Sequence, residues 1–149
     1  MSNSIEDAIS NVVEQFLHPY LNHFHEYKID RDSGAIEIRG LVNENDHGKT
    51  LVLKVLFSHE KHLAAIPNIF MPEFMKRKGL GKQLIAIIHQ ALKQYRYQLL
   101  IIDLVPSFYE KLVRRGAVIC EEGESVLITD ETHLGSSSAQ PGSQEGLRE

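Results

Sequence analysis

Residues 76–82, Lys-Arg-Lys-Gly-Leu-Gly-Lys, place four cations and two glycines together in a chain whose formal net charge is −4. They lead into the strongest amphipathic helix pattern of the chain, residues 79–95. The N-terminus of a helix has unpaired backbone N–H groups and a positive partial charge, so it attracts anions. Gly79 and Gly81 lack side chains that would keep a ligand away from the backbone. This combination favours a diphosphate site, with cations at Lys76, Arg77, Lys78 and Lys82.

Two common phosphate-binding motifs do not fit this segment. A Walker A loop requires Ser or Thr after Gly-Lys, and Gln83 stands there instead. A dinucleotide fingerprint requires a third glycine where the chain has Leu84. A glycine-bearing loop with a solvated basic face therefore remains an alternative interpretation of the same residues.

The hydrophobic pattern predicts the elements that position this segment. Apolar residues recur at helical spacing in three stretches, and strand-like runs lie between and around them. The order indicates a mixed α/β fold rather than a regular alternating doubly wound sheet. Helices are predicted over residues 4–17, 79–95 and 106–115, and strands over 27–29, 36–41, 50–57, 63–71, 98–103, 117–120 and 125–129.

Single residues carry further local expectations. Ser4 is a suitable N-cap for the first helix, and Pro19 is expected to end its pattern. Pro67 lacks an N–H, so pairing is expected to fail locally in the strand over residues 63–71. Cys120 is expected to be a small core residue of its strand.

A second motif follows the basic segment. Phe108-Tyr109-Glu110-Lys111 opens a short helix that ends at Gly116 and leads into two strands. With Lys76-x-x-Gly79-x-Gly81 before it, the chain resembles the GNAT superfamily of N-acetyltransferases. The hallmark of that family is Arg/Gln-x-x-Gly-x-Gly/Ala between its fourth strand and the following helix, and here Lys76 takes the first position.

The resemblance implies a GNAT-like fold, with a central, mostly antiparallel sheet, splayed fourth and fifth strands, and flanking helices. It implies acetyl-CoA as cosubstrate, held between the splayed strands, and no metal. The reaction is direct transfer of the acetyl group to a primary amine of a small molecule or a protein. The residues that would bind the cosubstrate are Ile69, Phe70, Met71, Lys76, Arg77, Lys78, Gly79, Leu80, Gly81 and Lys82.

The resemblance also gives Tyr109 the role of proton donor to the leaving thiolate. A phenol is protonated at neutral pH, which suits a donor. Residues 63–68 contain neither the Glu nor the His that many members carry on the fourth strand, so the general base stays open. Candidates are water, Glu60, His62, Glu73 and Asp103. The alternative function is a catalytically inactive acetyltransferase fold that binds CoA or another protein.

Composition narrows the class of protein. With 42% hydrophobic and 24% charged residues, residues 1–134 fit a single globular domain. Residues 135–149 are poor in apolar groups, so we expect a disordered tail.

The single cysteine excludes a disulfide framework. With neither a signal peptide nor a membrane span in the pattern, we expect a cytoplasmic protein without a membrane partner. The acidic net charge argues against nucleic acid as a partner, and the sequence does not decide between a monomer and a homodimer.

Overall fold

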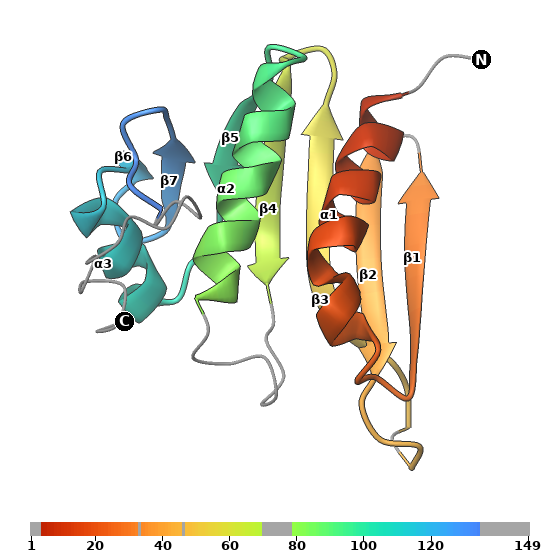
Figure 1. Cartoon of the computed structure of the whole chain (residues 1–149). Helices are drawn as coiled ribbons and strands as arrows, with labels where there is room; N and C mark the ends of the chain where they lie inside the picture. The colour runs from red at the N-terminus through yellow and green to blue at the C-terminus, as the bar shows by residue number, and fades with distance from the viewer. Residues whose placement is uncertain (1–3, 33, 46, 70–78, 135–149) are drawn as a thin grey trace, which may run out of the picture.

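The computed structural model describes residues 4–32, 34–45, 47–69 and 79–134 of the chain. They form an α/β structure in which a seven-stranded mixed sheet is flanked by three helices (Figure 1). The α/β class and the predicted order of elements are confirmed, whereas the predicted disordered tail, residues 135–149, lies outside the described residues. The helices are α1 Ile5–Leu21, α2 Leu80–Lys93 and α3 Pro106–Arg114. The strands are β1 Glu26–Asp32, β2 Ala35–Leu41, β3 Thr50–Ser58, β4 Leu63–Ile69, β5 Gln98–Ile101, β6 Val118–Glu121 and β7 Ser125–Ile128.

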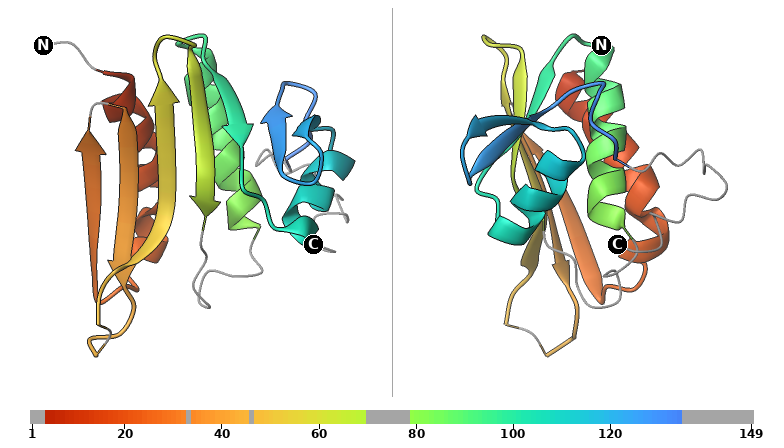
Figure 2. Two further views of the ribbon diagram at one scale, coloured as in Figure 1. Left: turned by 180° about the vertical axis from the view of Figure 1, so that it is seen from behind. Right: turned by 90° about the vertical axis from the view of Figure 1, so that its left-hand side faces the viewer.

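The strands lie in the order β1-β2-β3-β4-β5-β7-β6. The first four form an antiparallel meander, and α2 then crosses over so that β5 runs parallel to β4. The closing β6–β7 hairpin inserts β7 beside β5, which makes β6 the outer strand (Figure 2). The sheet therefore changes from antiparallel to parallel pairing at one place, between β4 and β5.

One hydrophobic core joins the sheet to the helices. Helices α1 and α2 lie side by side against the same face of the sheet (Figures 1 and 2). Leu17 of α1 and Leu84 and Ile88 of α2 are completely buried. Burial of each such side chain stabilises the fold by roughly 1.5–3 kcal/mol. Within the described residues, no helix is long and apolar enough to cross a membrane.

Several local signals act as predicted, but Pro19 does not. The hydroxyl of Ser4 accepts a hydrogen bond from the Asp7 N–H at 3.1 Å, as an N-cap does. Helix α1 nevertheless continues through Pro19 to Leu21, so the prediction that the helix ends there is wrong. Proline removes one backbone hydrogen bond near the end of the helix, and the complete burial of Leu17 and Leu21 stabilises the turn that contains it.

Cys120 is also placed differently from the prediction. It is exposed on β6 rather than buried in the core. Because β7 lies between β5 and β6, the residues of β6 have a neighbouring strand on one side only among the described residues. All four residues of this strand are exposed.

Candidate functional site

The parallel ladder between β4 and β5 stops before β4 does. It pairs Leu63 with Gln98 and ends where Ile66 pairs with Ile101. A further backbone hydrogen bond, from the Ile102 N–H to the Ile66 carbonyl at 3.1 Å, closes it. Strand β4 itself continues to Ile69. Strands β4 and β5 therefore pair from their first residues as far as Ile66 and Ile101, and the backbone segments separate beyond this point.

The course of the chain after β5 accounts for this separation. Pro67 of β4 has no N–H to donate, but the backbone of Ile66 bonds toward β5, so Pro67 faces β3. The register against β3 shifts between Lys54 and Leu56, as predicted for a strand interrupted by proline. After β5, Asp103 takes a left-handed conformation with φ 54°. The next residue, Leu104, donates its N–H to the Glu124 carbonyl at 3.1 Å. The chain after β5 thus follows the β6–β7 hairpin instead of β4.

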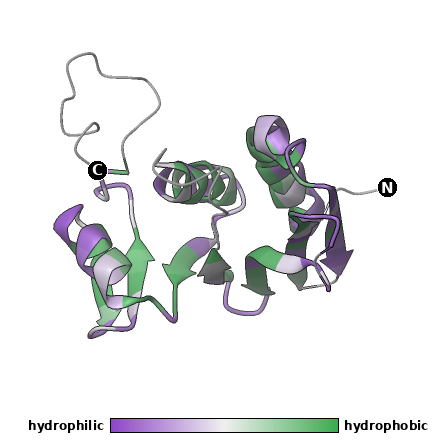
Figure 3. Cartoon of the chain, turned by 90° about the horizontal axis from the view of Figure 1, so that it is seen from below, coloured by the Kyte–Doolittle hydropathy of each residue, from purple (hydrophilic) through white to green (hydrophobic). Residues whose placement is uncertain are grey.

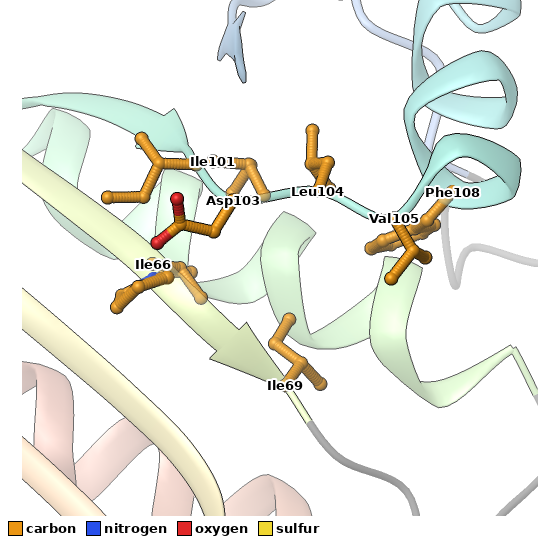
Figure 4. A pocket seen from close by; sticks show the side chains of 9 residues that line it. Ile66, Ile69, Ile101, Asp103, Leu104, Val105 and Phe108 are labelled. Atoms are coloured by element: carbon orange, nitrogen blue, oxygen red, sulfur yellow. The ribbon is translucent and has the colours of Figure 1, made fainter. Parts of the chain in front are cut away.

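A pocket of about 140 Å³ lies where the two strands separate. Its lining is apolar except for Asp103, whose carboxylate points from the end of β5 toward β4 (Figure 4). A positive φ is uncommon outside glycine, although Asp and Asn tolerate it better than most residues. The described lining residues are Ile66, Pro67, Ile69, Ile101, Ile102, Asp103, Leu104, Val105 and Phe108.

The first turn of α2 adjoins this pocket through Phe108. A Cβ added to Gly81 would lie 3.9 Å from Cζ of the Phe108 ring. Gly79 is the N-cap of α2 and has φ 69°, a left-handed conformation that favours glycine. The first turn contains no acidic residue, so no carboxylate competes for the positive end of the helix. This geometry suits an anion at the start of α2.

The structure brings together part of the predicted cosubstrate site. Ile69 lines the pocket, and Gly79, Leu80, Gly81 and Lys82 form the start of α2. Leu80 belongs to the hydrophobic core, and Lys82 is only 7% exposed, so its side chain is not part of a solvated basic face. The predicted contacts Phe70, Met71, Lys76, Arg77 and Lys78 lie outside the described residues.

Tyr109, the predicted proton donor, follows Phe108 in α3. Its ring is half-buried and packs against the core. Phe108, rather than Tyr109, lines the described part of the pocket. The sequence motif therefore brings an aromatic ring to the pocket, and the role of the Tyr109 hydroxyl stays a prediction.

The structure places the candidates for the general base at different distances from the pocket. Asp103 lines the pocket. Glu60 and His62 lie in the β3–β4 connection, before the first residue of β4, whereas the pocket lies at the far end of that strand. Glu73 lies outside the described residues. Among the described candidates, Asp103 is the one that is close enough to act in the pocket.

Comparisons with protein-family models, curated proteins and solved structures give no match to this chain. Within the described ranges, no group of three or more His, Cys, Asp or Glu side chains is arranged to hold a metal ion.

The structure also contains a polar network that the sequence analysis missed. Glu6 is buried in the first turn of α1, and its Oε2 accepts hydrogen bonds from the Gly34 N–H at 2.6 Å and from Nε2 of His59 at 2.7 Å. Nδ1 of His59 lies 2.6 Å from the hydroxyl of Tyr97. Burial and the nearby Glu6 charge raise the pKa of Tyr97, so its phenol stays protonated and donates to His59. The network ties α1 to the β1–β2 turn, the β3–β4 connection and the segment before β5.

The Glu6 carboxylate gives stability that depends on pH. Burial alone raises the pKa of Glu6, but hydrogen bonds from its own N–H, from Gly34 and from His59 outweigh burial and hold the pKa below the ordinary value of 4.5. A lowered folded-state pKa stabilises the protein at pH values above the unfolded-state pKa, and this stabilisation is lost as the pH falls through the folded-state pKa.

We therefore expect Glu6→Gln to lower the free energy of unfolding by about 1–3 kcal/mol at neutral pH, because it weakens charge-assisted hydrogen bonds to a buried group. The difference in the free energy of unfolding between parent and variant should become smaller as the pH falls below 4.5. Chemical denaturation of both proteins, from neutral pH to below 4.5, measures this difference. Glu60→Gln, at an exposed position, is the matched control. A deficit that does not change with pH would contradict the assignment.

Proposed function

We propose that this protein is an N-acetyltransferase that transfers the acetyl group of acetyl-CoA to a primary amine. One observation carries the proposal. The parallel ladder of β4 and β5 stops at Ile66 while β4 continues, and a pocket lies between the strands beside the first turn of α2. The pantetheine arm would occupy this pocket, and the diphosphate would bind the backbone N–H groups at the start of α2.

The pocket suits an acyl thioester and an amine. Ile69, Ile102 and Leu104 provide apolar surface for the arm. The bound cosubstrate supplies an acetyl group activated as a thioester. An alkylammonium with a pKa near ~10.4 must lose a proton before it can attack, which costs roughly 4–5 kcal/mol at pH 7. Asp103 is the carboxylate placed to accept that proton.

Three protons move in this scheme. The ammonium first gives one proton to Asp103, which passes it to solvent. The neutral amine nitrogen then forms a bond to the acetyl carbon, its second proton passes to Asp103, and the carbon–sulfur bond breaks. Tyr109 gives its hydroxyl proton to the leaving sulfur and regains one from solvent. Asp103 thus accepts protons from the amine, and Tyr109 donates a proton to the sulfur.

The direct test compares ligands that share phosphates. We expect calorimetry to show tighter binding of CoA than of ADP, because ADP lacks the arm that would fill the pocket. A panel of amines should then release free thiol from acetyl-CoA in an amine-dependent manner. Failure to bind CoA would overturn the proposal.

A substitution at the start of α2 tests the phosphate site separately. We expect Gly81→Glu to weaken CoA binding by at least about tenfold, because a carboxylate there repels the diphosphate. The same change should not lower the melting temperature, since Glu suits the first turn of a helix better than Gly. Calorimetry and a thermal melt give both quantities.

Gly81→Ala is the matched control, because it adds a Cβ at ordinary contact distance from Phe108 without charge. It should retain CoA affinity. Gly79 is less suitable for this test, because its φ of 69° would strain any other side chain whether or not a ligand binds. Unchanged affinity in Gly81→Glu would remove the start of α2 from the site.

The second candidate function is an inactive acetyltransferase fold that binds CoA or a protein partner. The presence of Phe108 rather than Tyr109 in the described pocket lining favours it. CoA binding without thiol release for any amine would support this alternative over the enzyme.

A further inference from the structure

The two outer strands of the sheet differ in chemistry. On β1, five of seven residues are charged: Glu26, Lys28, Asp30, Arg31 and Asp32. Charges on an edge strand oppose pairing with another chain. On β6 the sequence is Val-Ile-Cys-Glu, so three of its four residues are uncharged. Figure 3 shows how hydrophilic β1 is beside the hydrophobic central strands. The β1 edge thus carries a run of charges that the β6 edge lacks, whereas β6 is four residues long and its register against β7 shifts between Ile119 and Glu121.

The apolar side chains of β6 are open to solvent. Val118 and Ile119 are each 48% exposed, and as neighbours in a strand they project to opposite faces of the sheet. No strand in the described part of the chain lies beyond β6. A strand added at this edge would cover apolar surface on both faces while it paired with the backbone.

Charges at the two ends of β6 indicate what that strand is. Arg114 is the last residue of α3, and Arg115 is its C-cap, separated from β6 by two residues. Glu121 ends β6, and Glu122 and Glu124 lie in the turn that follows. Antiparallel pairing of β6 with an identical strand would bring the basic end of each copy to the acidic end of the other. Parallel pairing would instead place like charges together. The edge is therefore self-complementary in one orientation.

We infer that β6 is a dimerisation edge, where it pairs antiparallel with β6 of a second copy and joins the two sheets. A two-fold arrangement uses the same surface on both subunits, as most homodimers do. Burial of Val118 and Ile119 supplies affinity, and the charges at the ends of the strand fix the orientation. This inference does not depend on acetyl-CoA binding.

Sedimentation and light scattering over a range of protein concentrations test it. The parent protein should show a concentration-dependent dimer. Ile119→Lys should raise the dimer dissociation constant at least about tenfold, because it places charge in the contact. Tyr27→Lys, a matched change at the 36% exposed Tyr27 on β1, should leave it unchanged. Val118→Lys provides a second variant if Ile119→Lys folds poorly.

Charge reversal tests the orientation. Arg114→Glu and Glu122→Arg should each weaken the dimer, and the two together should restore it. A protein that stays monomeric at its highest soluble concentration would overturn the inference. So would a dimer that tolerates lysine at both β6 positions, or one in which the double reversal gives no recovery.

Discussion

Asp103→Asn should lower kcat for amine acetylation by about 10²–10⁴-fold, the usual contribution of a general base. The amide keeps the size of the carboxylate but does not accept the amine proton. Asn also tolerates a positive φ, so the backbone at φ 54° should be preserved. Steady-state kinetics with any accepted amine, beside CoA calorimetry, would separate lost proton transfer from lost binding.

The pH dependence of this variant gives an independent readout. As the pH approaches the pKa of the amine, more of the substrate is already deprotonated, so the gap between parent and variant should narrow. Asp32→Asn, at an exposed position on β1 away from the pocket, is the matched control and should retain full activity. A kcat within about threefold of the parent would exclude Asp103 as the base.

Local signals in the sequence predicted most elements because they act over a few residues. Ser4 caps α1, Pro106 occupies the first turn of α3, and Gly116 follows α3 with φ 101°. Each of these residues satisfies a backbone requirement of its own segment, so tertiary contacts are not needed to interpret it. The helix that begins at residue 80 was equally clear from its apolar stripe.

Features that depend on distant residues were not predictable in this way. Glu6 and His59 are 53 positions apart, and neither stands in a pattern that indicates pairing. The exposure of Cys120 follows from the insertion of β7 beside β5, which hydrophobic periodicity does not show. Pro19 was misjudged because burial of Leu17 and Leu21 outweighs a local helix-breaking preference.

The candidate site is a mixture of both kinds of feature. Gly79 and Gly81 were recognised from local sequence, and the structure places Gly79 at the N-cap of α2 and Gly81 beside Phe108. Asp103 was one of several candidate bases. Its position depends on where the segment after β5 moves away from β4 and follows the β6–β7 hairpin. The course of the chain after Asp103 depends on the hydrogen bond from the Leu104 N–H to the Glu124 carbonyl, a partner distant in the sequence.

Tyr109→Phe is the second change for which we expect a loss of about 10²–10⁴-fold in kcat, with CoA affinity unchanged. It removes one hydroxyl and keeps the ring that packs against the core. If Tyr109 protonates the leaving sulfur, the loss falls on turnover, because that proton moves only near the transition state.

The same variant decides between a catalytic and a purely structural role for Tyr109. Neighbouring side chains on a helix diverge by about 100°, so a catalytic Tyr109 would approach the sulfur from another direction than Phe108. A purely structural tyrosine would lower the melting temperature and leave kcat of the folded protein nearly normal. Tyr95→Phe, at the 38% exposed Tyr95 just after α2, is the matched control. If Tyr109→Phe retains kcat within about threefold, Tyr109 has no part in the proton transfer, and the thiolate must leave with solvent as its donor.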